Sequence, residues 1–314
     1  MPETRSANTV IAGMPKCGTT SLFGYLAAHP QVCGASVKET RFLMDPDSPL
    51  FNSDASLNLH GEKKYTLFFR HCGNQPIRLE STPDYFYQTT ALHYLGNLRP
   101  GPKLIFLLRE PAQRVYSLFR FAQNNLSILD RNMDFTRFLE KVRKGDFGRR
   151  PILQNCLTHS HYYHYLKPWF ESMSSDNILL LTLEALKADP RSTMARTAAF
   201  LGIDPGFYTA YTFNILNRSI GVRWSGLHRW KRRLSRHLPE GPLRRLLGRA
   251  YGLVNVQGAD PLGMDRDRRV LDRLTLEFAE ENRRLIQLGL DVSTVWEPPA
   301  TYSVAGWRVE EAAS

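Results

Sequence analysis

Residues 9–26 read TVIAGMPKCGTTSLFGYL, and the rest of the chain is organised around this stretch. The apolar run at its start predicts a short buried strand. Gly13 and Gly18 then interrupt regular structure, and apolar residues take helical spacing from Thr19 onward. The first N–H groups of a helix lack intrahelical partners, and the helix dipole attracts negative charge there. The stretch therefore predicts an anion-binding loop between a strand and a helix.

The loop is close to a Walker A motif, G-x-x-x-x-G-K-[ST], but its lysine stands elsewhere. Gly13 and Gly18 have the Walker spacing, yet the lysine is Lys16, inside the loop. A P-loop kinase or NTPase needs a lysine directly after the second glycine and an acid that binds magnesium, and neither is evident. A plain Gly/Pro turn is the simpler alternative. We favour an anion site because three adjacent hydroxyl residues accompany the lysine: Thr19, Thr20 and Ser21.

Composition limits the class of protein. The 314 residues, 42% of them hydrophobic, suffice for one large α/β domain or two small ones, and a formal net charge of +11 favours anionic partners. Four scattered cysteines without a C-x-x-C pair argue against a zinc site and a disulfide scaffold, and suit a reducing compartment. They are Cys17, Cys33, Cys72 and Cys156. The polar N-terminus and the lack of an 18-residue apolar span predict a cytoplasmic protein, at most peripheral to a membrane.

Strands and helices alternate along the chain. Buried strands are expected at 10–12, 32–35, 77–80, 103–108 and 178–183. Helices are expected at 65–71, 90–98, from 111, 161–173, 190–201 and 266–288, with loop at 45–60 and a mixed pattern at 124–160. Apolar strands between helices are typical of a parallel sheet covered on both faces. We expect one α/β domain over residues 1–314, with a core at about 9–218 and a basic helical extension at about 219–297.

The loop resembles the 5′-phosphosulfate loop of sulfotransferases that use 3′-phosphoadenosine 5′-phosphosulfate (PAPS). The family pattern P-K-x-G-T-[TS]-x-L is matched by Pro15, Lys16, Gly18, Thr19, Thr20 and Leu22. The resemblance implies the P-loop-type sulfotransferase fold and in-line transfer of a sulfuryl group from PAPS, without a metal. It implies that Lys16 neutralises the leaving oxygen. The 5′-phosphosulfate would be bound by Lys16, Cys17, Gly18, Thr19, Thr20 and Ser21.

A second anion site is predicted where strand 103–108 ends. Arg109 follows this strand directly, at the edge where ligands bind in open α/β sheets, and Ser117 comes about two helical turns later. A guanidinium can bind phosphate through two hydrogen bonds, although Arg109 could instead pair with a carboxylate such as Glu110. The family pattern L-R-x-P-x-x-R-x-x-S is matched by Leu108, Arg109, Pro111, Arg114 and Ser117. The resemblance implies that Arg109 and Ser117 bind the 3′-phosphate.

Glu39 is the candidate general base. It lies in a polar break after strand 32–35, where nearby cations would keep it ionised, although it could simply pair with Arg41 on the surface. Sulfotransferases that act on glycosaminoglycans, and many bacterial relatives, carry K-E-x-x-[FY]-[FL], which is matched by Lys38, Glu39, Phe42 and Leu43. Enzymes for small phenols and steroids use a histidine instead. The acceptor implied is a saccharide, with a lipid or small natural-product alcohol as the alternative.

Two departures from the family pattern concern the substrate side and the nucleotide closure. Residues 80–85 resemble E-x-S-P-x-Y but lack the lysine found there in glycosaminoglycan enzymes. The basic loop that closes the nucleotide is not found, and its nearest substitutes are Asn214, Asn217 and Arg218. Three histidines, at 159, 161 and 164, have spacings that do not suit a metal site, so we expect no bound metal.

The segment 223–249 combines nine Lys and Arg residues with an apolar stripe. It is interpreted either as a solvated helical arm or as a surface for an anionic membrane or an acidic glycan acceptor. Only Trp224 and Trp230 interleave the cations, so nucleic acid is not an expected partner.

Overall fold

The computed structural model describes residues 6–214, 221–222, 256–257, 261–290, 292 and 296. Asn217, Arg218 and the basic segment 223–249 lie outside these residues, and what the sequence predicts for them stays a prediction.

A five-stranded parallel sheet forms the centre of the fold, with strand order β2-β3-β1-β4-β5. The strands are β1 (Thr9–Gly13), β2 (Val32–Gly34), β3 (Ile77–Ser81), β4 (Lys103–Leu108) and β5 (Ile178–Thr182). The middle strand, β1, is buried throughout, and its Val10 lies in register with Glu80 of β3 and Leu104 of β4. The predicted parallel α/β sheet is confirmed. A separate antiparallel pair consists of β6 (Gly221–Val222) and β7 (Val256–Gln257).

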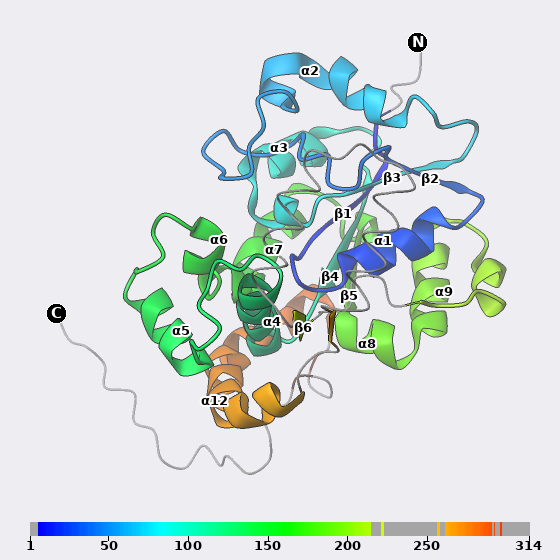
Figure 1. Cartoon of the computed structure of the whole chain (residues 1–314). Coiled ribbons are helices and arrows are strands. Elements are labelled where there is room, and N and C mark those ends of the chain that lie inside the picture. Colours follow the sequence, from blue (N-terminus) through cyan, green and yellow to red (C-terminus); the bar gives the residue numbers. More distant parts are fainter. Residues whose placement is uncertain are drawn as a thin grey trace.

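Helices cover both faces of the sheet, with α1, α8 and α9 on one side and α3, α4 and α7 on the other (Figure 1). The α-helices are α1 (Thr19–Ala27), α2 (Leu57–Thr66), α3 (Thr89–Asn97), α4 (Pro111–Asn124), α5 (Phe135–Arg143), α6 (Pro151–Gln154), α7 (Tyr162–Ser172), α8 (Leu183–Ala188), α9 (Pro190–Leu201) and α12 (Pro261–Arg284). Short 3-10 helices are η1 (Leu67–Phe69), η2 (Pro83–Tyr87), η3 (Thr158–Ser160), η4 (Ser175–Asn177), η5 (Pro205–Thr209) and η6 (Leu285–Leu288). None of the helices described is both long enough and apolar enough to cross a bilayer.

The helix α2 differs from the sequence prediction. It occupies the end of the expected 45–60 loop and merges into η1, where a helix over 65–71 was expected. The helix is polar and buries only Tyr65, so its sequence carries little amphipathic signal. An aromatic contact anchors it, because the Tyr65 ring stacks on Phe42 at 5.1 Å between centroids. The mixed stretch 124–160 likewise contains α5 and α6, and the last helix begins five residues early, at Pro261.

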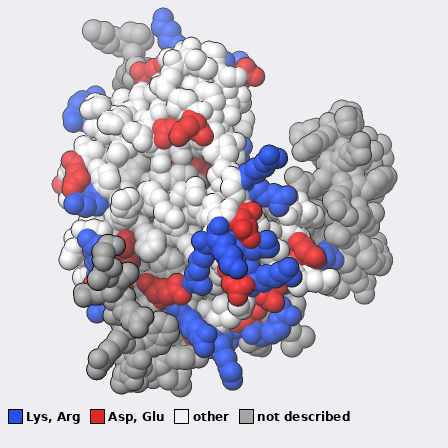
Figure 2. Space-filling model, turned by 90° about the vertical axis from the view of Figure 1, so that its left-hand side faces the viewer, with Lys and Arg blue, Asp and Glu red and all other residues white. Residues whose placement is uncertain are grey.

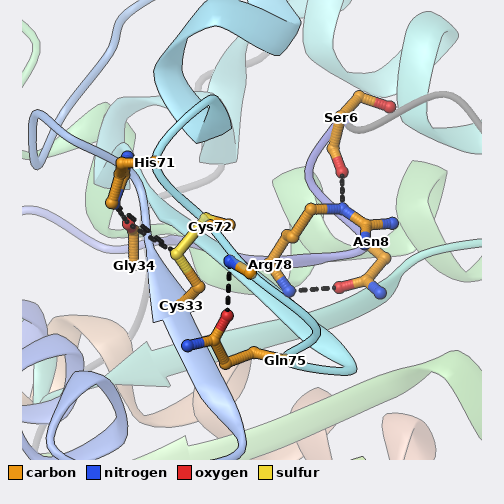
Figure 3. Close-up of a disulfide and its surroundings, with 9 residues drawn as sticks. Ser6, Asn8, Cys33, Gly34, His71, Cys72, Gln75 and Arg78 are labelled. Carbon is orange, nitrogen blue, oxygen red and sulfur yellow. Dashed lines mark hydrogen bonds between the residues drawn. A yellow bond between two sulfur atoms is a disulfide. The ribbon is translucent and has the colours of Figure 1, made fainter.

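The scattered cysteines argued against a disulfide scaffold, and the sequence did not predict the disulfide that the structure contains. Cys33 of β2 and Cys72, three residues after η1, are joined, with 5.8 Å between their Cα atoms (Figure 3). Spacing alone could not reveal this pair, since 39 residues separate the two cysteines and the fold brings them together. Cys17 and Cys156 are buried free thiols.

Candidate active site

The loop between β1 and α1 forms a cradle at the carboxyl edge of the sheet. Gly18 ends it with φ +89°, and a Cβ added there would lie 2.7 Å from Cδ1 of Leu183, so only glycine fits. Helix α1 begins directly afterwards at Thr19, and neither a side-chain cap nor an acidic residue occupies its first turn. Its N-terminus therefore faces the loop with uncompensated positive potential.

Lys16 lies inside this loop in the left-handed conformation, with φ +72°. Its Nζ atom is 3.6 Å from the centroid of the Phe121 ring in α4. Burial and, to a lesser degree, the neighbouring charge of Arg109 lower the pKa of Lys16 to about 8. Within the described part of the chain, neither cation forms an ion pair. Two partly desolvated cations near each other make a region that favours an anion.

Arg109 directly follows β4, and both its backbone and its side chain have hydrogen-bond partners. Its carbonyl accepts a hydrogen bond from Tyr162 at 2.8 Å, and its Nη2 lies 3.5 Å from Oε1 of Gln113. Ser117 is on α4, which starts with Pro111 at its first turn, and is 8% exposed. The sequence predicts that Arg109 and Ser117 act together. In the structure, Arg109 directly follows the end of β4, and Ser117 is in α4, the next helix.

Lys187 of α8 is a third cation of this region, and the sequence reasoning missed it. Burial and the charge of Arg109 lower the pKa of Lys187, so the two side chains are neighbours. A signal was available, because Lys187 comes five residues after the end of β5, at the same sheet edge as Arg109.

Arg114 and Cys17, which lie within the two motif stretches, make contacts inside the protein that support the fold. Arg114 is buried and donates to Oγ of Ser160 at 2.6 Å and to the carbonyl of Cys156, which ties α4 to η3. The Cys17 side chain is also buried, and burial raises the pKa of its thiol to about 12. Its backbone N–H donates to the carbonyl of Met14 at 3.2 Å. Cys17 therefore packs under the loop on its buried side, and its thiol is protonated.

Glu39 lies at the carboxyl edge of β3, next to β1. Its backbone N–H donates to the Ser81 carbonyl at 3.0 Å, and it adopts φ +66°. Its carboxylate contacts Nζ of Lys38 at 2.7 Å and Nη2 of Arg41 at 3.3 Å, with the side chain one-third exposed. Lys16 and Glu39, the two candidate catalytic residues, are both non-glycine residues with positive φ. Such conformations persist where surrounding structure enforces them, often at functional sites.

A buried network fixes the segment that carries Glu39. The carboxylate of Glu80 accepts hydrogen bonds from Thr40 at 2.6 Å, from Thr82 at 2.7 Å and from Tyr65. Burial raises the pKa of Glu80, and these three donors oppose that rise. The hydroxyl of Thr40 also accepts the backbone N–H of Phe42 at 3.3 Å. Glu80 is therefore a positioning residue, because it holds Thr40, the residue next to Glu39.

Replacing Glu80 by alanine is expected to lower the free energy of unfolding by about 3 kcal/mol, because three buried hydroxyl donors lose their acceptor. Urea denaturation followed by circular dichroism measures this change. Glu62→Ala is the control, since Glu62 is only partly buried and lies outside this network, where it accepts a hydrogen bond from Ser6. Equal losses in the two variants would contradict the role of the network.

A cavity of about 530 Å³ opens beside this segment. Its polar lining includes Asp84, Tyr87, His159, Arg149 and Arg150. Burial raises the pKa of Asp84, and the charges of Glu39, Arg41 and Lys38 also act on it, so the cavity and Glu39 are neighbours. Tyr87 donates a hydrogen bond to Asp84 and stacks on the His159 ring, with 3.9 Å between centroids. The cavity thus combines an aromatic pair with carboxylate and guanidinium groups.

The three histidines face different partners. Burial, together with the charge of Arg114, lowers the pKa of His159 to about 4, so this cavity residue is neutral at pH 7. His161 instead contacts α12, with Nδ1 3.5 Å from Oε2 of Glu281, and the His164 N–H donates to the same carboxylate. His159, His161 and His164 therefore do not form a single site: His159 lines the cavity, and the other two contact α12.

The surface next to the cavity is positively charged. Figure 2 shows Lys and Arg gathered on the face that carries α5 and α6, with Asp and Glu between them. Part of this charge is paired, because Lys141 contacts Asp146 at 3.1 Å and Arg143 contacts Glu277 at 2.8 Å. Arg149 and Arg150 are exposed where they line the cavity.

The parallel sheet, the loop at the N-terminus of α1 and the neighbouring cations Lys16 and Arg109 form a site suited to an anionic ligand. Residues 6–212 match the sulfotransferase domain family, and the chain belongs to this family. The family match gives no support to the kinase alternative.

Known relatives agree with this assignment. The chain is 25% identical over 205 residues to human bifunctional heparan sulfate N-deacetylase/N-sulfotransferase 2, covering 62% of this chain and 22% of that protein. It is 24% identical over 210 residues to mouse heparan sulfate N-deacetylase/N-sulfotransferase 4, covering 65% and 23%. The chain therefore spans about a fifth of the length of these relatives. The crystal structure of a sulfotransferase from Alicyclobacillus acidocaldarius has the same fold, with a TM-score of 0.63, 19% identity, and coverage of 92% of this chain and 98% of that one.

Proposed function

We propose that this enzyme transfers a sulfuryl group from PAPS to a hydroxyl or amine of a saccharide, with Glu39 as the general base. The observation that carries the proposal is the pair of partly buried cations, Lys16 and Arg109, which come from the ends of adjacent strands β1 and β4. A ligand with two separate anionic groups fits this pair, because each group would compensate a charge that the described protein leaves unpaired.

Two groups of residues would bind the two anionic ends of PAPS, the 5′-phosphosulfate and the 3′-phosphate. PAPS, when bound, supplies a sulfuryl group attached to a phosphate that can leave. The N-terminus of α1 and its hydroxyl residues Thr19, Thr20 and Ser21 would hold the 5′-phosphosulfate. Arg109 and Ser117, with Lys187 nearby, would hold the 3′-phosphate.

The chemical roles belong to Glu39 and Lys16. Glu39 takes the proton of the attacking hydroxyl or amine, and its carboxylate contacts the cations Lys38 and Arg41. Lys16 donates to the oxygen that gains charge as the bond to the sulfuryl group breaks. The site's own cations therefore supply the charge stabilisation.

The acceptor would bind in the cavity beside Glu39. Its volume of about 530 Å³ suits one or two sugar units, and its carboxylate and guanidinium groups suit polar substituents of a saccharide. Relatives named as heparan sulfate N-sulfotransferases support a saccharide over a lipid or a small natural-product alcohol.

Radiolabelled PAPS tests this proposal directly. The full chain would be incubated with labelled PAPS and, in separate reactions, with desulfated heparin, a neutral dextran, 2-naphthol and a long-chain alcohol. Label is expected in a saccharide. Label only in 2-naphthol or the lipid would overturn the acceptor class, and no transfer to any acceptor would leave the choice of Glu39 as base without support.

Adenosine 3′,5′-bisphosphate is expected to stabilise the protein to heat more than adenosine 5′-phosphate does. The extra phosphate gains charge-assisted hydrogen bonds with Arg109, each of about 1.5–3 kcal/mol, or roughly 10- to 150-fold in affinity. Thermal shift measurements with both nucleotides check this. Arg109→Ala should remove the difference, whereas Arg137→Ala, at an exposed position of α5, should preserve it. Equal stabilisation of the wild type by both nucleotides would contradict the 3′-phosphate assignment.

A further inference from the structure

A cluster of two cysteines and a histidine lies at the outer edge of the sheet, away from the cation pair. Cys33 is in β2, the edge strand, and the disulfide joins it to Cys72 (Figure 3). His71 is beside them, with Nε2 3.5 Å from Sγ of Cys33. The proposed reaction uses none of these residues.

The disulfide closes the segment that carries Glu39. Edge strand β2 has only three residues, and the chain after it is held by few backbone hydrogen bonds. Ala35 donates to the Leu79 carbonyl at 2.8 Å, Ser36 to the Phe68 carbonyl at 2.9 Å, and Glu39 to Ser81. Phe68 belongs to η1, which the disulfide fixes against β2. The covalent bond therefore supports the base-bearing segment from its outer side.

His71 gives the two sulfur atoms different chemistry. Its Nε2 lies 3.1 Å from the carbonyl oxygen of Gly34, and a carbonyl can only accept, so Nε2 carries the hydrogen. The same N–H is directed toward Cys33, where it would stabilise a thiolate. Because this nitrogen has no free lone pair, the geometry suits thiol–disulfide exchange better than metal binding. Cys72 is 7% exposed, and the residues on either side of it, His71 and Gly73, are exposed, so this is the side from which a small thiol would approach.

We propose that Cys33 and Cys72 form a reversible thiol–disulfide site that controls the position of Glu39; its effect on catalysis rests on the proposed function of Glu39. A glutathione thiolate attacks Sγ of Cys72, the protein disulfide breaks, and Cys33 leaves as a thiolate beside His71. A second glutathione thiolate then attacks the mixed disulfide and releases Cys72 and glutathione disulfide. Two glutathione thiols are oxidised and one protein disulfide is reduced, and glutathione disulfide drives the reverse reaction.

Reduction is expected to loosen residues 35–41 without affecting nucleotide binding. After reduction, the segment keeps the backbone bonds of residues 35–39 and the hydrogen bonds of Thr40 and Arg41 to Glu80 and Thr82, but loses its covalent link to η1. Lys16 and Arg109 follow the inner strands β1 and β4, away from this link. Oxidised protein therefore holds the base in position, and reduced protein leaves it mobile relative to the nucleotide.

Hydrogen exchange on the full chain tests the proposal without an acceptor. Amides of residues 35–41 are expected to exchange about tenfold faster in dithiothreitol than in glutathione disulfide, as local opening predicts. The double variant Cys33→Ser/Cys72→Ser should show the fast rate in both buffers. Cys156→Ala, which removes a buried free thiol, should keep the response. Mass spectrometry after alkylation should show two more modified cysteines on reduction.

Three results would overturn the proposal. The first is the same exchange rate at 35–41 in both buffers, which would make the disulfide purely structural. The second is equal loss of protection across the whole sheet, or loss of affinity for adenosine 3′,5′-bisphosphate, which would mean global unfolding. The third is failure of glutathione disulfide to re-form the bond. Because exchange is read without turnover, a redox response in a protein that transfers no sulfuryl group would count against the proposed function alone.

Discussion

Replacing Glu39 by glutamine is expected to slow sulfuryl transfer by about 10²- to 10⁴-fold, the usual range for loss of a general base. The affinity for adenosine 3′,5′-bisphosphate should not change, because Glu39 is not among the residues proposed to bind the nucleotide. Single-turnover transfer from labelled PAPS measures the rate, and calorimetry measures nucleotide affinity.

The local geometry makes this substitution informative. Glutamine has the same size, and Glu39 is held by its backbone N–H to Ser81, so the loop should keep its conformation. The change removes the proton acceptor and weakens the contacts with Lys38 and Arg41. Because these cations flank the carboxylate, the Arg41→Ala variant separates loss of the contact from loss of the base, and it should retain much more activity than Glu39→Gln.

Glu171→Gln is the matched control, since Glu171 is an exposed residue of α7 that pairs with Lys167. It should transfer at the wild-type rate. A Glu39→Gln enzyme within a few-fold of wild type would remove Glu39 from the mechanism. Attention would then move to Asp84, the neighbouring carboxyl, and away from His159, because burial lowers the pKa of that histidine to about 4 and leaves it a weak base.

The parts of the fold that could be predicted are those encoded locally. An apolar strand, a glycine turn and a helix start follow one another in residues 9–26, and the structure has β1, the loop and α1 at these positions. Arg109 directly follows an apolar strand, and the rule that ligands bind at carboxyl ends of parallel strands places it near Lys16.

The parts that could not be predicted depend on tertiary contacts. The Cys33–Cys72 pair requires knowing that η1 packs beside β2. The position of Lys187 after β5 was a signal for the ligand-binding edge, but its place beside Arg109 also depends on the pairing of β5 with β4. The positive φ angles of Lys16 and Glu39 have no signature in residue type, since both favour negative φ and are held by their surroundings. Arg114 shows the converse, because a motif position that could have been a ligand is a buried structural donor.

Replacing Lys16 by methionine is expected to slow transfer by about 10²- to 10³-fold, the range for loss of one donor to a developing negative charge. Methionine keeps the length and packing of the side chain against Phe121 but removes the cation. Without nucleotide, the variant should be at least as heat-stable as wild type. The folded-state pKa of about 8 lies below the ordinary value of 10.5, so at pH 7 the protonated lysine opposes folding.

The same pKa predicts how nucleotide affinity depends on pH. Bound phosphosulfate favours protonated Lys16, so the free enzyme must take up a proton when it binds above pH 8. Affinity for adenosine 3′,5′-bisphosphate should be nearly constant below pH 8 and fall by about tenfold per pH unit above it. Titrations between pH 6.5 and 9.5, in buffers that differ in ionisation enthalpy, would show the proton uptake.

Lys16→Arg tests the origin of this dependence, because arginine keeps the charge and does not titrate in this range. It should bind the nucleotide with an affinity that no longer falls above pH 8. Lys187→Met should retain the fall if Lys16 is responsible, although burial lowers the pKa of Lys187 as well. Lys167→Met, at an exposed position of α7, should behave like wild type throughout. A wild-type affinity that stays flat to pH 9.5, or a slope that disappears in Lys187→Met and persists in Lys16→Arg, would show that Lys16 is not the cation that meets the phosphosulfate.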